Sequence, residues 1–171
     1  MNIGVNQFCF PMSYDVADAV KAAKRLGFDS IEVCFTAADG ARPGGGVTDA
    51  LDISGYHNRL LNMGSTDKDV RELKKLADDT GIRISSVGGI VSFSIYPLTA
   101  TDAQVAQKSM DAVKKMLDFA RILGADTILV IPGMLTADME YKAAYDLAQS
   151  RVAQLAAYAP DIQLAIENVW N

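Results

Sequence analysis

The sequence has 171 residues, of which 50% are hydrophobic and 22% charged, and its formal net charge is −5. This length favours one domain, 1–171, with a substantial hydrophobic core, and the composition excludes broad disorder. The acidic balance argues against a nucleic-acid partner, because phosphate backbones would be repelled, and no apolar stretch is long enough to cross a membrane. The first residues lack the cationic start and the cleavage site of a signal peptide, so we expect a cytoplasmic protein.

Apolar periodicity and helix-stop signals predict strands and helices in strict alternation. In chain order, the predicted elements are a strand at 3–8, a helix at 15–26, a strand at 30–35, a helix at 67–80, a strand at 82–87, a helix at 101–123, a strand at 127–131, a helix at 138–159 and a strand at 162–167. A capping box formed by Thr101 and Gln104 is predicted to begin the third helix.

Internal similarity supports this alternation. The stretch AKRLGFDSIEV at 23–33 aligns with ARILGADTILV at 120–130, and both read as a helix end, a Leu-Gly stop, an Asp and an apolar strand. Glycine is the expected residue at such a stop, because it accepts a positive φ without a Cβ clash. Degenerate copies occur at 76–87 and 155–168, where Gly81 and Pro160 take the place of the stop. The repeating unit is therefore one strand and one helix.

Repeated units of this kind predict a parallel sheet covered by helices. Two architectures fit: a doubly wound open sheet and a (β/α)8 barrel. The sequence QFCFPMS follows the first strand where a nucleotide-binding sheet would carry G-x-G-x-x-G, which favours the barrel. Because a complete barrel needs eight strands and about 250 residues, we expect an incomplete barrel of five strands and four helices.

Two carboxylates stand on predicted strands. Glu167 ends the last strand, where catalytic groups of barrels lie, although a solvent-exposed terminal glutamate fits the spacing equally well. Glu32 interrupts the apolar strand at 30–35, and a buried carboxylate needs a partner, so it is either a pocket residue or half of a structural ion pair. Gly133 ends the fourth strand, where it could admit a ligand or simply form a turn. His57 is the single histidine, which argues against a multi-histidine metal site within this chain.

The chain resembles the xylose isomerase-like family of sugar isomerases and epimerases, which also contains endonuclease IV-type repair enzymes. The resemblance rests on GFDSIEV at 27–33, GIRISSVGG at 81–89, ARILGADTILVIPG at 120–133 and LAIENVWN at 164–171. It implies a (β/α)8 barrel with a divalent metal at its C-terminal mouth, most often Mn²⁺ or Mg²⁺, with Zn²⁺ and Co²⁺ as alternatives. It also implies a sugar or sugar phosphate as substrate.

In this family the glutamate that closes the fifth strand is a metal ligand and an acid/base group, which points to Glu167 for both roles. The remaining ligands come from later strands, so we expect them beyond Asn171 and expect the isolated chain to be inactive. Glu32 and Phe8 fall where the family lines its substrate pocket. Asn6, Gly133 and Trp170 are weaker substrate-binding candidates. We also expect self-association, because an incomplete barrel leaves strand edges open. Alternative functions are a polyol dehydratase of the same fold, an abasic-site nuclease and an inactive sugar-binding half-barrel.

Overall fold

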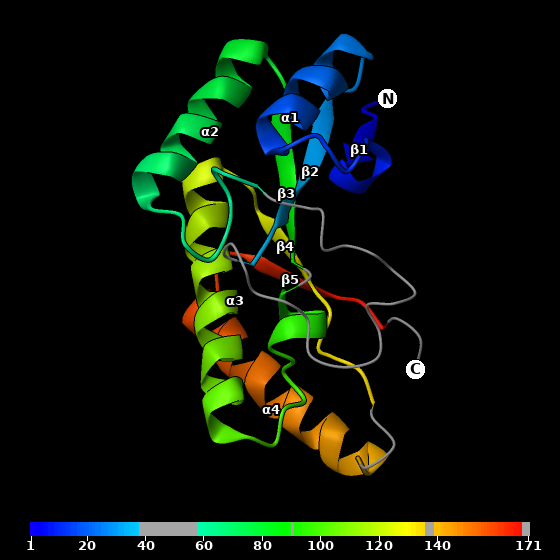
Figure 1. Cartoon of the computed structure of the whole chain (residues 1–171), viewed down its shortest axis with the longest axis vertical. Coiled ribbons are helices and arrows are strands. Elements are labelled where there is room, and N and C mark those ends of the chain that lie inside the picture. Colours follow the sequence, from blue (N-terminus) through cyan, green and yellow to red (C-terminus); the bar gives the residue numbers. More distant parts are fainter. Residues whose placement is uncertain (38–57, 90, 136–138, 169–171) are drawn as a thin grey trace.

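A computed structural model describes residues 1–37, 58–89, 91–135 and 139–168 of the chain (Figure 1). Five strands are present in this part: β1 (Gly4–Asn6), β2 (Ser30–Phe35), β3 (Arg83–Gly89), β4 (Thr127–Val130) and β5 (Gln163–Ile166). Four α-helices alternate with them: α1 (Val16–Arg25), α2 (Asp67–Thr80), α3 (Ala103–Leu123) and α4 (Tyr141–Tyr158). Two short helical turns follow β1 and β3, namely η1 (Gln7–Cys9), a 3-10 turn, and η2 (Val91–Ile95), a π-helical turn.

The strands form one parallel sheet in the order β1-β2-β3-β4-β5. An order without reversal is the one expected of consecutive barrel units, so the prediction of five parallel strands with alternating helices is confirmed. A doubly wound sheet would reverse its order at a switch point, and that alternative is wrong. The helices follow one another along the sheet in the same sequence as the strands (Figure 1).

The hydrophobic core lies between the sheet and the helices. Alternate residues of β2, namely Ile31, Val33 and Phe35, are buried on the face that meets the helices. The opposite face, which we call the inner face, carries the residues in between, beginning with Glu32 and Cys34. Successive side chains of a strand point to opposite faces of the sheet. Because the apolar residues of β2 are buried against the helices, the residues between them must lie on the inner face.

Helix ends follow the predicted signals. Gly27, Gly81 and Gly124 come just after α1, α2 and α3 with φ of 87°, 71° and 72°. Each ends its helix in the left-handed conformation that L-residues with a Cβ adopt at a cost. None of the helices in the described part of the chain is both long and apolar enough to span a membrane.

Several element boundaries differ from the prediction, and three of the differences have a clear local cause. The first strand ends at Asn6 because its side chain accepts a hydrogen bond from the Phe8 N–H at 2.7 Å and starts the turn η1. Helix α3 is capped by Asp102, whose Oδ1 accepts from two backbone N–H groups, so the predicted Thr101 capping box is wrong. A carboxylate at this end of a helix also meets the positive pole of the helix dipole. Helix α4 begins at Tyr141, later than predicted, because Glu140 caps it in the same way.

Candidate functional site

A row of polar side chains crosses the inner face of the sheet. The register places five residues at one level, one from each strand: Asn6, Glu32, Ser86, Thr127 and Gln163. The next level toward the carboxyl ends of the strands holds small and apolar residues in β2 to β5, namely Cys34, Gly88, Leu129 and Ala165. The inner face therefore presents a polar row, and small or apolar residues lie above that row.

Glu32 is the centre of this polar row. Its carboxylate accepts a hydrogen bond from the Asn6 amide and another from the Ser86 hydroxyl at 2.7 Å. The Asn6 side chain also accepts a hydrogen bond from the backbone N–H of Phe8. Asn6, Phe8 and Glu32, all candidates from the sequence, are therefore linked by hydrogen bonds. Gly88 leaves room for the carboxylate, since a Cβ there would lie 3.4 Å from Glu32 Oε1. Among the described residues, the side chains that donate to Glu32 are neutral, and no ion pair of Glu32 is seen there.

Glu167 stands apart from that group. Its backbone N–H donates to the Val130 carbonyl at 3.1 Å, which continues the β4–β5 ladder by one residue, and its side chain is exposed. Gln163 occupies the level of Glu32, so Glu167 lies four residues, or about 13 Å, further along the strand direction. The carboxylate makes no hydrogen bond or ion pair with the described residues, and it is free to bind a ligand.

A groove of about 420 Å³ opens beside Glu167. Its lining comes from the loop after β4, from one side of α4 and from the end of β5, and includes Gly133, Tyr141, Tyr145, Gln149, Glu167 and Asn168. The volume is in the range of small-molecule sites. Gly133 has a φ of 139°, and a Cβ there would lie 2.5 Å from Thr99 Oγ1. The glycine thus lets the loop after β4 pack tightly onto the segment before α3.

Sequence reasoning missed a buried amide pair, Gln7 and Asn58, which joins η1 to the segment before α2. Gln7 is 0% exposed, and its Oε1 accepts from the backbone N–H of Cys34 at 2.8 Å. Gln7 Nε2 donates to Asn58 Oδ1 at 2.8 Å, and the Asn58 amide donates to the Cys34 carbonyl. A glutamine and an asparagine separated by 51 residues give no spacing signal, so this contact is visible only in the fold. Of the other residues discussed in the sequence, His57 and Trp170 lie outside the described residues.

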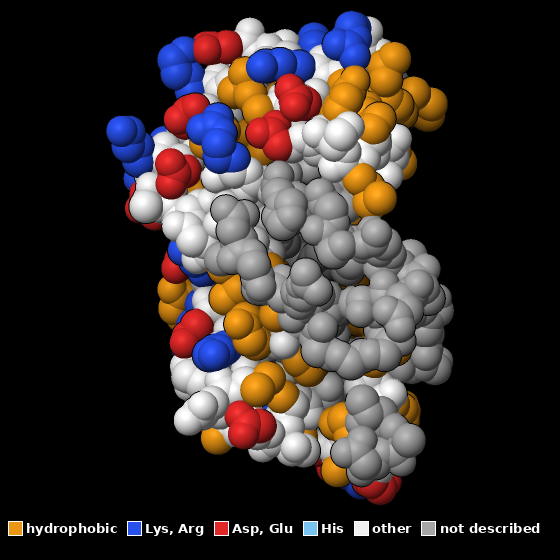
Figure 2. All heavy atoms as spheres, in the orientation of Figure 1, with side chains coloured by type: hydrophobic (Ala, Val, Ile, Leu, Met, Phe, Trp, Pro, Cys, Tyr) orange, Lys and Arg blue, Asp and Glu red, His pale blue; other side chains and the backbone are white. Residues whose placement is uncertain are grey.

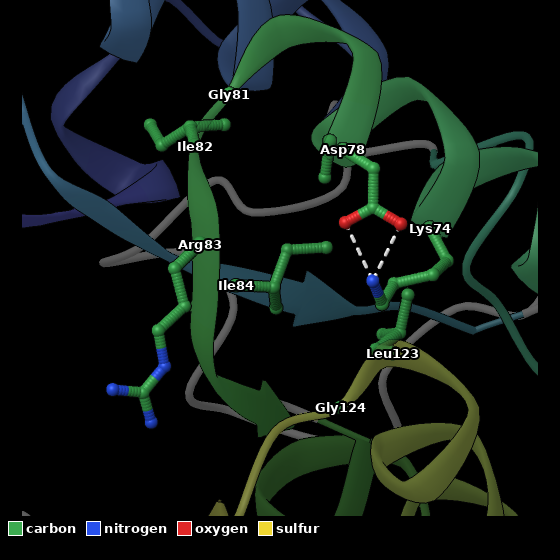
Figure 3. Close-up of a pocket in the computed structure, with 9 residues that line it drawn as sticks. Lys74, Asp78, Gly81, Ile82, Arg83, Ile84, Leu123 and Gly124 are labelled. Carbon is green, nitrogen blue, oxygen red and sulfur yellow. Dashed lines mark hydrogen bonds and ion pairs between the residues drawn. The ribbon is translucent and has the colours of Figure 1, made fainter.

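A second cavity, of about 440 Å³, lies at the opposite end of the sheet, where α2 and α3 end (Figure 3). Lys74 and Asp78, one turn apart on α2, point toward one another at one side of the cavity, with Nζ to carboxylate distances of 2.5 and 2.6 Å (Figure 3). Arg83 points away from them (Figure 3). Arg83 pairs with Asp126 at 3.1 Å. The charged groups of this cavity are already paired, which favours a structural role for this end of the sheet.

The side chains with the clearest pKa shifts also lie away from the inner face. A side-chain hydrogen bond from Arg121 lowers the pKa of Asp161 to about 2. The hydrogen bond that the Tyr158 hydroxyl donates to Asp118 raises the pKa of Tyr158. These groups hold α3, α4 and the segment before β5 together at the surface, and none of them contacts Glu32 or Glu167.

Charged side chains of both signs lie on the face of the molecule drawn in Figure 2. Basic and acidic side chains are interspersed over α2, and no patch of one sign forms there. Hydrophobic side chains gather instead over the N-terminus and β1 (Figure 2). The large exposed hydrophobic residues of this region are Met1, Ile3, Phe8, Met12 and Leu26.

Among the described residues, no group of three or more His, Cys, Asp and Glu side chains is placed to hold a metal ion. Glu167 supplies one hard oxygen ligand, and four-coordinate or higher sites need more. A complete metal site therefore does not exist within the described part of the chain.

A family model described as xylose isomerase-like TIM barrel matches residues 20–171. The chain belongs to this family. The match covers β2 to β5, so it includes both carboxylates, Glu32 and Glu167. A comparison with curated protein sequences gave no significant match.

Solved structures with the same fold include a D-psicose 3-epimerase studied in the presence of D-fructose, which is 21% identical with a TM-score of 0.68. A D-psicose 3-epimerase from Clostridium cellulolyticum H10, solved with D-tagatose, is 17% identical with a TM-score of 0.69. A 3-keto-D-glucoside 4-epimerase from E. coli is 16% identical with a TM-score of 0.65. Each match covers 99% of this chain but only 53%, 53% and 56% of the other chain. The chain thus spans about half the length of these structures.

Proposed function

We propose that the chain supplies the first five strand–helix units of a metal-dependent sugar isomerase or epimerase. Membership in the xylose isomerase-like family supports this proposal. The observation that carries it is the exposed carboxylate of Glu167 at the carboxyl end of β5, which makes no hydrogen bond or ion pair with the described residues. Catalytic groups of barrels lie at this end of the strands. The proposed domain is a single barrel, to which residues outside this sequence would add the remaining strands.

The reaction we propose is proton transfer at a carbon next to a ketone. The names of the similar structures agree with it: a ketose 3-epimerase and a 3-keto-glucoside 4-epimerase both invert a carbon adjacent to the carbonyl carbon. Such a carbon loses a proton when a base is in reach and the developing enediolate charge is stabilised. Glu167 is the proposed base. Inversion also needs a second acid/base group that delivers a proton to the opposite face of the carbon, and this group would have to come from outside the described residues.

A divalent cation, Mn²⁺ or Mg²⁺ in the first place, would stabilise the oxyanion when bound. Glu167 fits such an ion because a carboxylate without hydrogen bonds keeps its lone pairs free. The other ligands would have to come from outside the described residues. We propose a different role for the inner polar row. The Glu32 carboxylate, held by Asn6 and Ser86, would accept hydrogen bonds from sugar hydroxyl groups on the inner face of the sheet. Phe8 would contact the same sugar, on the side of the inner face away from Glu167.

Deuterium exchange at the reacting carbon tests the proposal. D-fructose, D-psicose and D-tagatose are incubated in D₂O with Mn²⁺ and either this chain or a longer product of the same gene, and NMR follows loss of the proton signal. We expect exchange with the longer protein, none with the 171-residue chain, and at least about a 100-fold loss in the longer Glu167→Gln variant.

Glu72→Gln serves as the matched control, because Glu72 is exposed on α2 and has only a 3.8 Å contact with Arg59. The proposal fails if no ketose exchanges with the longer protein, or if Glu167→Gln is as active as Glu72→Gln. Full metal-dependent exchange by the 171-residue chain would show that the catalytic site lies within it and that Glu167 is not one ligand of a larger set.

A further inference from the structure

We propose that Arg151 is a positioning residue for sugar binding: it holds the loop after β3 and, through that loop, the loop after β4. This inference rests on the proposed function and adds a residue of α4 that touches neither the sugar nor a metal ion. Both loops lie at the carboxyl ends of their strands, and each contributes a residue, Thr99 and Gly133, to the groove beside Glu167. Loops at this end of a barrel carry its active site, so their shape decides how a substrate is bound.

The guanidinium of Arg151 binds the loop after β3 at two points. Residues 97–100 of this loop form a turn, which a hydrogen bond from the Ala100 N–H to the Pro97 carbonyl closes at 3.1 Å. Arg151 Nη1 donates to the Leu98 carbonyl and, at 2.8 Å, to the Ala100 carbonyl. A guanidinium presents its N–H groups in a rigid plane, so two acceptors on one turn fix the turn against α4. Among the described residues, these two carbonyls are the hydrogen-bond partners of Arg151, and no carboxylate competes for it.

The loop after β4 packs on the same turn. Gly133 is buried, and a Cβ on it would lie 2.5 Å from Thr99 Oγ1 and 2.8 Å from Pro97 Cβ. Leu98, between these two residues, is 0% exposed and anchors the turn in the core. The turn therefore joins α4 to the loop after β4, and a change at Arg151 should reach Gly133 through it.

A second arginine separates this role from ordinary stabilisation of the fold. Arg121 also makes two bonds to one partner, Asp161, at 2.8 and 2.7 Å. That pair ties α3 to the segment before β5, at the amino end of the strand, where barrel residues serve stability. Loss of Arg121 should weaken the fold and leave sugar binding unchanged, whereas loss of Arg151 should change both.

Urea unfolding of the 171-residue chain tests the structural step. Arg151→Met keeps the apolar stem of the side chain and removes its donors, and Gly133→Ala disturbs the contact with Thr99 and Pro97. If both act on one turn, the midpoint of the double variant should fall by about 0.5 M less than the sum of the two single shifts. Arg121→Met combined with Gly133→Ala should give the plain sum. Arg151→Lys, which keeps one charged donor, serves the same comparison if Arg151→Met does not fold.

The functional step is measured on a longer product of the same gene, with the ketoses and Mn²⁺ of the exchange assay. We expect Arg151→Met to raise KM about ten-fold and to leave kcat within about two-fold, because Glu167 stays on β5 while the loops around the sugar loosen. Arg151→Lys should recover part of the KM, and Arg121→Met should leave KM unchanged. Saturation-transfer NMR should show the same loss of affinity for D-fructose without any need for turnover.

Strict additivity of Arg151→Met and Gly133→Ala would overturn the inference, as would an equal rise in KM with Arg121→Met. An unchanged KM in Arg151→Met, with exchange of D-fructose by the longer protein, rejects the inference and leaves the proposed function standing. Conversely, D-fructose binding that weakens in Arg151→Met but not in Arg121→Met, without exchange of any ketose, supports the role of Arg151 and rejects the proposed reaction. A longer protein that binds no ketose would overturn both.

Discussion

Replacing Gln7 by alanine should destabilise the fold strongly, although the residue lies in a short turn. β1 ends at Asn6, so the backbone of Cys34 extends past the strand that pairs with β2. The side chains of Gln7 and Asn58 take the place of that strand, since they bind the N–H and the carbonyl of Cys34. Both side chains are buried, with 0% and 1% exposure. The amide pair therefore holds η1 against β2 and fixes the chain at Asn58.

The magnitude follows from the two hydrogen bonds that Gln7→Ala removes. The N–H of Cys34 loses its 2.8 Å bond to Gln7 Oε1, and Asn58 Oδ1 loses its 2.8 Å bond from Gln7 Nε2. A buried polar group that loses its partner costs about 1–3 kcal/mol, so two such groups give a loss of about 3 kcal/mol in the free energy of unfolding. Asn58→Ala removes the other half of the same network, and the double variant should be less destabilised than the sum of the two by about 1 kcal/mol.

Urea unfolding followed by circular dichroism measures these differences, provided that the slope of the transition stays the same in all variants. Gln154→Ala is the matched control; Gln154 is exposed on α4 and has a single weak contact with Ser150 at 3.4 Å. This control should stay within about 0.5 kcal/mol of the parent chain. A loss below about 1 kcal/mol for Gln7→Ala, or strict additivity with Asn58→Ala, would refute the view that the two amides act as one unit.

Three further predictions concern pH, backbone strain and association. The Arg121 bond lowers the pKa of Asp161 from its usual 3.8 to about 2, so the folded state favours the carboxylate. The stability that this ionised carboxylate adds is present above pH 4 and is lost as the pH falls toward 2. The unfolding temperatures of the parent chain and of Asp161→Asn should therefore differ at pH 6 and converge near pH 2. Gly133→Ala should lower the free energy of unfolding by about 2 kcal/mol, because a residue with a Cβ is strained at a φ of 139° and that Cβ would clash with Thr99. An unchanged free energy of unfolding in urea titration would contradict this. We also expect the chain to self-associate through its open edges, and Ile3→Ser, at an exposed residue before β1, should shift sedimentation toward the monomer; a parent chain that is monomeric at high concentration would contradict this.

The order of the elements could be read from the sequence because each junction repeats one local signal. Gly27, Gly81 and Gly124 end three helices with positive φ, and each is followed by an apolar strand. Local chemistry of this kind acts within a few residues, so it is visible without knowledge of the fold. The right-handed connection of parallel strands then leaves few possible sheet orders, and the observed one is the simplest of them.

The arrangement of the candidate site could be predicted only in part. The alternation within β2 correctly places Glu32 on the inner face, opposite Ile31 and Val33. Its contact with Ser86, however, depends on a register shift between β2 and β3, in which Ile31 pairs with Ile84 while Glu32 pairs with Ser86. Such a bulge adds one residue to a strand and changes which side chains are neighbours across the two strands. No residue type in β2 or β3 predicts this bulge from the sequence.

The two carboxylates of the inner face stand in opposite surroundings, and this difference separates their possible roles. Glu32 accepts hydrogen bonds from Asn6 and Ser86, one on each carboxylate oxygen, so its orientation is fixed and part of its lone-pair capacity is used. Glu167 has no such bonds among the described residues and is exposed at the end of β5. A carboxylate that must bind a cation or exchange a proton needs free lone pairs, whereas one that positions a hydroxyl group needs a fixed direction. These environments support the proposal that Glu167 binds a cation and moves a proton while Glu32 positions hydroxyl groups, although the sequence shows both residues alike as charges on apolar strands.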